Sequence, residues 1–198
     1  MTMLRLDVDA SAFARLGNAW QVAGKNGPVA LAWGINAVGR KALTQMRRAL
    51  VGQTGMRYGV FVRALRAKNA SANNLEFRIT SRGGNVRLKF FSPKETRAGT
   101  TATPWNRRTL YGGAFMKGGQ FPGRVPLRMG RGNVFKRLGR SRLPIKVMRS
   151  DLYIPDEMIT GASKASFDQV TGRDLEDAAV RALYAILSGV SVSSRNFR

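Results

Sequence analysis

Residues 28–50 read PVALAWGINAVGRKALTQMRRAL, and their apolar side chains recur every three or four positions. This period predicts an amphipathic helix, which Pro28 at its first turn suits. The predicted buried stripe consists of Leu31, Ile35, Val38, Ala42, Met46 and Ala49. Gly34 and Gly39 lie inside the helix, where each costs about 1 kcal/mol relative to alanine. We therefore expect both glycines to pack closely against a neighbouring element.

The sequence before this helix predicts a short strand and a further helix. Leu4, Leu6 and Val8 alternate with polar residues, as in a half-buried strand. Ser11 can cap a helix. The apolar positions of that helix are Phe13, Leu16, Trp20 and Ala23.

Two segments follow the central helix. Residues 57–68 suggest a short basic helix with Arg57, Arg63, Arg66 and Lys68. Residues 75–91, LEFRITSRGGNVRLKFF, alternate between apolar and polar on both sides of a Gly-Gly pair. This pattern predicts a β-hairpin that turns at Gly83 and Gly84.

The middle of the chain is rich in glycine, proline and arginine. Residues 108–119, RTLYGGAFMKGG, are typical of a strand with a glycine bulge, and LPIKVM predicts another strand after Pro144. Residues 118–142 lie between these strands and favour a long loop or flexible hairpin over a buried element.

The C-terminal part predicts helices. Pro155-Asp156-Glu157 is a typical helix start, since acids favour the positive end of the helix dipole. We expect Gly172 to interrupt the helix and Thr171 with Asp174 to restart it as a capping box. The restarted helix would place Leu175, Ala179, Leu183 and Ile186 on one face.

Together these patterns predict an α+β fold, with a mainly antiparallel sheet flanked by N- and C-terminal helices. We expect a single domain over residues 1–190, with residues 94–150 as a long basic Gly/Pro-rich loop or hairpin within it. Residues 191–198 form a C-terminal tail in this interpretation.

The charge is one-sided and unevenly placed. The chain has 34 Lys and Arg against 11 Asp and Glu, a net charge of +23. Residues 94–150 hold fourteen basic side chains and one acid, Glu95, whereas residues 151–198 hold five basic and seven acidic ones. Such a charge requires a neutralising partner. Nucleic acid is the first candidate, an acidic protein the second and an anionic membrane surface a distant third.

The residue inventory argues against an enzyme. The chain has no Cys and no His, which removes thiolate catalysis, the commonest general base and the usual metal ligands. Asp7 and Asp9 are better explained as exposed strand carboxylates than as metal ligands. No Walker-type phosphate loop is present. We expect no catalytic residue, no metal and no cofactor, and no segment is apolar over the length that spans a bilayer.

The basic stretch is the candidate site. Its cations lie among glycines and prolines, a composition suited to contacts with phosphate that do not depend on sequence. They are Arg107, Arg108, Lys117, Arg124, Arg128, Arg131, Lys136, Arg137, Arg140 and Arg142. The interleaved aromatics could stack on bases or anchor the loop to the domain. They are Trp105, Tyr111, Phe115, Phe121 and Phe135. DNA and an acidic protein neighbour both remain open as partners.

The order of segments resembles the minor tail protein Z family and the wider tail-completion and neck proteins of long-tailed bacteriophages. ALAWGINAVGRKAL at 30–43 looks like the family's N-terminal helix, and YGGAFMKGG at 111–119 like its Gly-Ala-Phe strand. LPIKVMRSDLYIP at 143–155 and the closing helix at 167–187 follow in the same order, as does the segment at 75–91.

This resemblance implies a virion protein at the head-proximal end of the tail, assembled in the host cytoplasm. It would form a homo-oligomeric ring, sixfold or twelvefold, beside the tail terminator and the leading end of packaged DNA. Two alternatives stay open: a sequence-nonspecific nucleic-acid-binding protein outside a virion, and a nuclease-like enzyme that needs a metal.

Overall fold

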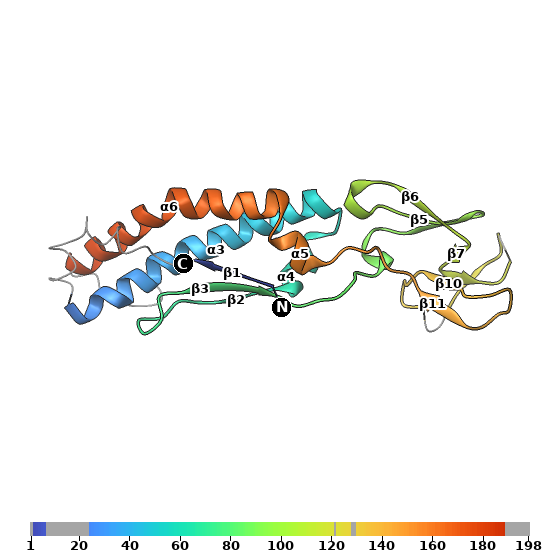
Figure 1. Cartoon of the computed structure of the whole chain (residues 1–198), viewed down its shortest axis with the longest axis horizontal. Helices are drawn as coiled ribbons and strands as arrows, with labels where there is room; N and C mark the ends of the chain where they lie inside the picture. Colours follow the sequence, from blue (N-terminus) through green and yellow to red (C-terminus); the bar gives the residue numbers. More distant parts are fainter. Residues whose placement is uncertain (1, 7–23, 121, 128–129, 189–198) are drawn as a thin grey trace.

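A computed structural model describes residues 2–6, 24–120, 122–127 and 130–188. They form an elongated molecule (Figure 1), with two long helices beside a small sheet at one end and short strands at the other. We call these parts the helical body and the β end. The predicted α+β class, with antiparallel sheets and helices in the N- and C-terminal regions, is confirmed. The helix predicted around Trp20 lies outside the described residues.

Helix α3 spans Gly27–Thr54 and is the centre of the helical body. Pro28 lies in its first turn as predicted, and Gly55 ends it with a left-handed φ of 80°. The predicted stripe is buried from Leu31 to Met46, while Ala49 is half-buried and Leu50 takes the core position at that end.

The two glycines inside α3 lie at close contacts, as predicted. A Cβ at Gly39 would lie 2.4 Å from the Phe77 ring, and one at Gly34 would lie 2.9 Å from the carbonyl oxygen of Ala178. Both distances are shorter than real Cβ contacts, so only glycine allows these approaches. The packing offsets the poor helix propensity of the two residues.

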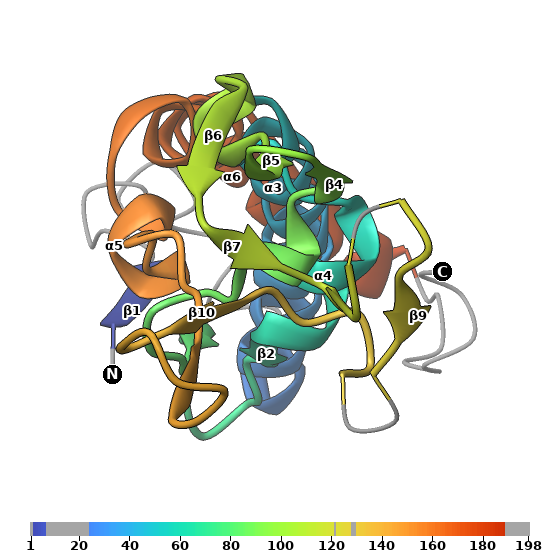
Figure 2. The same ribbon diagram turned by 90° about the vertical axis from the view of Figure 1, so that its right-hand side faces the viewer.

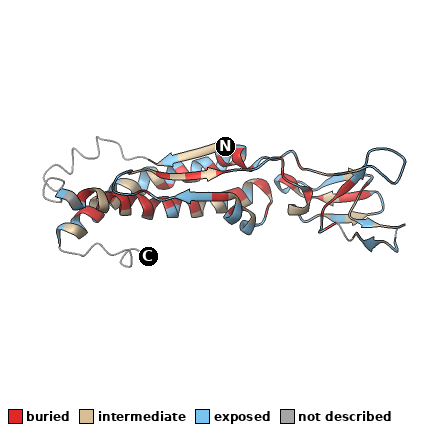
Figure 3. Cartoon of the chain, turned by 90° about the horizontal axis from the view of Figure 1, so that it is seen from below, coloured by how far each residue is buried: buried red, intermediate tan, exposed pale blue. Residues whose placement is uncertain are grey.

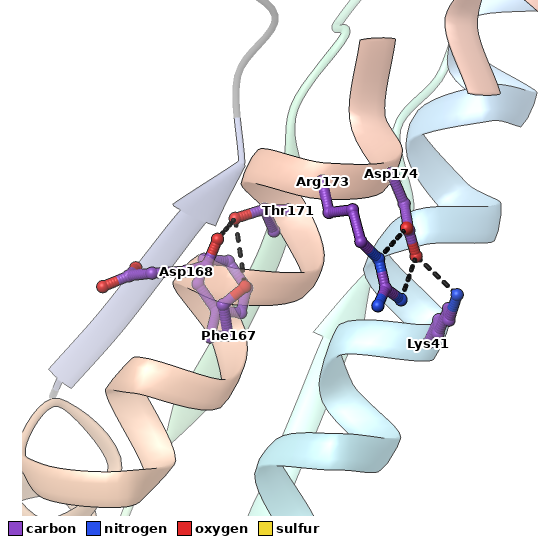
Figure 4. A network of polar contacts seen from close by, with 6 residues as sticks. All are labelled: Lys41, Phe167, Asp168, Thr171, Arg173 and Asp174. Carbon is purple, nitrogen blue, oxygen red and sulfur yellow. Dashed lines mark hydrogen bonds and ion pairs between the residues drawn. The ribbon is translucent and has the colours of Figure 1, made fainter. Parts of the chain in front are cut away.

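Helix α6 spans Gly161–Leu187 and runs antiparallel to α3 (Figure 1). It continues through Gly172, so the predicted interruption and capping-box restart are wrong. The Thr171 hydroxyl donates instead to the carbonyls of Phe167 and Asp168, at 3.0 and 3.1 Å (Figure 4). Contact with α3 along the whole length keeps the helix continuous despite its glycine.

The sheet of the helical body has the order β1-β3-β2 and is antiparallel throughout. Its strands are β1 (Thr2–Leu6), β2 (Leu65–Lys68) and β3 (Phe77–Ser81). The predicted alternation is confirmed in β3, where Phe77 and Ile79 are fully buried. Figure 3 shows buried residues concentrated where the helices and the sheet face one another.

Two short helices, α4 and α5, complete the helical body. Helix α4 (Tyr58–Ala64) is the predicted basic helix, but it ends four residues early, because β3 offers residues 65–68 a strand partner. Helix α5 (Ile154–Met158) begins where Pro155-Asp156-Glu157 predicted a helix start.

The hairpin predicted for residues 75–91 is not formed. Its first half is β3, whose two edges are already taken by β1 and β2. The second half pairs instead with residues 148–152, where the amides of Val86 and Leu88 donate to the carbonyls of Leu152 and Met148. These two antiparallel segments connect the helical body to the β end.

The β end, seen face-on in Figure 2, consists of three small antiparallel sheets. One has the order β4-β5-β6, from Lys94–Thr96, Gly99–Ala102 and Thr109–Gly112. A second has the order β11-β10-β7, from Ile145–Val147, Phe135–Arg137 and Ala114–Phe115. The third pairs β8 (Lys117–Gly118) with β9 (Val125–Pro126).

The prediction for residues 118–142 is confirmed in one half and wrong in the other. Strands β8 and β9 pair antiparallel as the two arms of a hairpin, as expected. Val134 and Phe135, however, are buried at the start of a paired strand. The high arginine and glycine content of this stretch hid a short core segment. One hydrophobic core continues from α3 into the β end, where it includes Val134.

Contacts at the end of α3 orient the β end. The 3-10 helix η3 (Pro104–Asn106) packs there, and Asn106 donates to the Gly52 carbonyl at 2.6 Å. The Trp105 indole N–H donates to Glu157 at 3.0 Å, and Gln53 donates to the same carboxylate. Within the described residues, no helix has the length and apolarity needed to cross a bilayer.

Candidate polyanion-binding site

The β end carries the predicted basic residues. Nine of the ten lie within the described residues, and Arg128 lies outside them. Eight of the nine are exposed: Arg107, Arg108, Lys117, Arg131, Lys136, Arg137, Arg140 and Arg142. The ninth, Arg124, is half-buried.

Part of this set lines a cavity of about 430 Å³ in the β end. The cavity brings together Lys117, Arg124 and Arg137 and adds a fourth cation, Arg97. The Arg137 guanidinium lies 5.7 Å from the centre of the Phe115 ring, a cation–π contact that fixes it at the cavity. We call this cavity the β-end pocket.

Glycines give the β-end pocket its open shape. Gly99, Gly113, Gly118 and Gly119 are among its lining residues. Gly113 and Gly119 adopt left-handed φ values of 68° and 90°, which side chains rarely tolerate. A lining without side chains at these positions lets an oxyanion approach both the backbone and the surrounding cations.

The single acid of the basic stretch is already engaged. Glu95 forms an ion pair with Arg124 and accepts a hydrogen bond from the Met116 amide at 3.2 Å. Its side chain is only 10% exposed. The carboxylate therefore holds the β8–β9 hairpin in place and neutralises one cation of the pocket, whereas Arg97, Lys117 and Arg137 are exposed.

The aromatic residues of the stretch serve mainly as anchors. Trp105 binds Glu157, Tyr111 packs against the core, and Phe115 contacts Phe135 with ring centroids 6.2 Å apart. Burial raises the pKa of Tyr111 above its ordinary value. Phe121 lies outside the described residues. The described aromatic residues of the stretch therefore take part in contacts within the fold.

Arg97 was not among the cations predicted from the sequence. It lies ten residues before the first predicted cation, yet the fold places it beside Lys117 and Arg137. The signal was present, since the acid-free segment starts at residue 96.

Across the described residues, no three Asp or Glu side chains gather as a metal site would require. Asp7 and Asp9 lie outside the described residues. Asp174, the acid of the predicted capping box, binds Lys41 and Arg173 in an ion-pair network between α3 and α6 (Figure 4).

Comparison with protein-family models, with curated proteins and with solved structures finds no match. The likeness to phage tail-completion proteins therefore stays a prediction from the sequence.

Proposed function

We propose that this chain is a structural virion protein of a long-tailed bacteriophage, a tail-completion or neck component at the head-proximal end of the tail. In this role it supports head–tail joining and positions the DNA end. Its β end contacts the DNA backbone without reading sequence, and the protein performs no catalysis.

One observation supports the proposed DNA contact. Of residues 94–150, fourteen are basic and one is acidic, and that acid is already paired with Arg124. A solvated protein surface normally mixes charges of both signs, because a one-sided charge repels itself. Packaged DNA supplies the opposite charge at high density, about one phosphate for every 1.7 Å of duplex axis.

The arrangement of the cations supports contact with phosphates over base reading. Arg131, Arg140 and Arg142 lie in turns and loops, whereas base-edge recognition needs a rigid helix or ribbon in the major groove. Phosphate contacts do not need such a rigid frame.

The ring assignment comes from the family resemblance, and exposed apolar residues at the β end support it. Leu110, Val125, Leu138 and Leu143 are each more than half exposed. Neighbouring subunits of a closed ring would cover such residues.

Labelling of intact phage particles tests this proposal. Particles from a host that produces this chain are bound with an antibody against it and imaged by electron microscopy. We expect label at the head–tail junction in several copies per particle. Label that is absent from particles, with the chain recovered in nucleic-acid complexes of the infected cell, would favour the alternative of a nonvirion nucleic-acid-binding protein.

A phage variant separates DNA from an acidic protein as the partner. With Arg131, Arg137 and Arg140 replaced by serine, we expect tails that assemble but eject DNA poorly. Failure at head joining, with DNA affinity unchanged, would instead show that these arginines bind a neighbouring ring.

A further inference from the structure

Helix α4 is bordered by three hollows that share lining residues. Their volumes are about 430, 540 and 530 Å³. All three include Arg63, the first two also share Ala64, and the last two share Val60, Lys89 and Phe90. We call the three hollows together the α4 groove. Figure 1 shows α4 where the sheet of the helical body meets the connection to the β end.

The rim of the α4 groove is cationic. Its charged lining residues are Arg57, Arg63, Arg66, Arg82, Arg87 and Lys89. No acid is among the described residues that line it. Asp151 accepts a hydrogen bond from one lining residue, Asn85, at 2.7 Å. None of the six cations belongs to the basic stretch predicted from the sequence.

The floor of the groove is apolar where it passes α4. The two larger hollows are lined by Val60, Phe90, Ile154 and Met116, of which Val60, Phe90 and Met116 are half-buried. The ammonium of Lys89 lies 5.2 Å from the centre of the Phe90 ring, so charge and apolar surface adjoin directly.

This combination differs from the β-end pocket, whose lining is mostly glycine and cations. A phosphate backbone needs cations and N–H donors but gains little from an apolar floor. A protein segment that carries both acidic and apolar side chains satisfies rim and floor together, because its apolar residues leave water while its carboxylates pair with the rim.

We propose that the α4 groove binds an acidic amphipathic segment of a partner protein. The apolar side chains of that segment rest on Val60 and Phe90, and its carboxylates pair with Arg63 and Lys89. The α4 groove shares no lining residue with the β-end pocket, although Met116 and Gly132 of the basic stretch also line the groove. The proposal does not rest on the proposed virion role.

Fluorescence anisotropy with the full chain and a labelled 16-residue peptide of repeated Asp-Leu-Asp-Phe tests this proposal. We expect binding that is lost when either the acids or the apolar residues of the peptide are replaced by serine. The rim variant Arg63→Ser/Lys89→Ser and the floor variant Val60→Ser should each weaken binding, the rim variant by about tenfold. The charge-matched control Arg48→Ser/Arg181→Ser should bind as the wild type does.

Thermal unfolding of each variant shows whether it remains folded, and Val60→Ala replaces Val60→Ser if that variant does not. A 20-nucleotide oligo-dT is the competing probe. The proposal is overturned if no peptide binds, or if the control variant loses as much affinity as the rim variant. It is also overturned if the rim variant loses affinity for oligo-dT while the floor variant binds both the peptide and oligo-dT as the wild type does. The groove would then bind phosphates and not an amphipathic protein segment.

Discussion

Asn36 lies in the middle of α3, is 8% exposed, and pairs with the backbone of Ala70. Its amide nitrogen donates to the Ala70 carbonyl at 3.0 Å, and its amide oxygen accepts from the Ala70 N–H at 2.7 Å. This two-way contact fixes the loop after β2 against the helix, as a strand partner would.

Replacing Asn36 with alanine should lower the free energy of unfolding by about 2–4 kcal/mol, because two buried backbone groups lose their partner. Urea denaturation measures the loss. The control Asn69→Ala, at an exposed position nearby, should stay within about 0.5 kcal/mol of the wild type. Equal effects of the two variants would show that the Asn36 contact adds no stability.

Asp174 links α3 and α6 through charge (Figure 4). The Arg173 guanidinium, and after it the Lys41 ammonium, holds the pKa of Asp174 well below its usual range. A folded-state pKa below the unfolded value of about 3.9 stabilises the protein above that pH. The stabilisation is lost as the pH falls below about 4 toward the folded-state value.

We therefore expect the wild type to lose more free energy of unfolding between pH 5 and pH 3 than Asp174→Asn does. The other carboxylates contribute equally to both proteins, so the difference reports Asp174 alone. Urea denaturation at the two pH values measures it. A wild type no more acid-sensitive than the variant would mean that the ion pair does not persist in solution.

At the scale of whole elements, glycines with different surroundings test the packing of the two long helices. A Cβ at Gly39 in α3 would meet the Phe77 ring, whereas one at Gly172 in α6 would meet nothing within 4 Å. Gly39→Ala should lower the free energy of unfolding by about 1–3 kcal/mol through overpacking. Gly172→Ala should raise it by up to about 1 kcal/mol through helix propensity. Thermal unfolding followed by circular dichroism measures both changes in stability. A gain in stability for both variants would contradict the close contact between Gly39 and Phe77.

Periodicity in the sequence was sufficient to predict α3, because each turn of an amphipathic helix repeats the same local information. The poor helix propensity of glycine predicted the close contacts at Gly34 and Gly39. Periodicity could not predict the strand pairing of residues 75–91. Alternation shows which side chains share one face of a strand, but not which other strand pairs with it. The break predicted at Gly172 failed for a similar reason: local propensity is weak beside the contacts that α6 makes along α3.

The candidate site was predictable as a composition but not as a shape. The excess of cations and the absence of acids from residue 96 onward could be seen directly in the sequence. The β-end pocket could not, because it joins Arg97 to Arg137 across forty residues through the pairing of short strands. The α4 groove was hidden for the same reason, as its cations come from α4, β2 and the segment after β3.

At the scale of the whole molecule, charge is segregated along the chain. Residues 151–198 hold seven of the eleven acids, whereas residues 94–150 hold fourteen of the 34 basic residues. The structure places the basic stretch at one end of an elongated shape, beyond the long helices (Figure 1). A molecule built this way can place its helical body in an assembly while its β end extends toward a polyanion.

The salt dependence of duplex DNA binding tests this account most directly. The variant replaces four arginines of the basic stretch 94–150 by serine, and the control replaces four exposed cations of the helical body. The variant positions are Arg128, Arg131, Arg137 and Arg140, and the control positions are Arg48, Lys68, Lys164 and Arg181.

Each lost phosphate contact lowers the steepness with which the logarithm of the binding constant falls with the logarithm of salt concentration by about 0.9, so this slope should fall by up to about 3.6 in the variant. We expect that fall, equal for unrelated DNA sequences, and an unchanged slope in the control. A variant slope equal to that of the wild type, or affinity lost for one DNA sequence alone, would contradict a nonspecific phosphate contact by the β end.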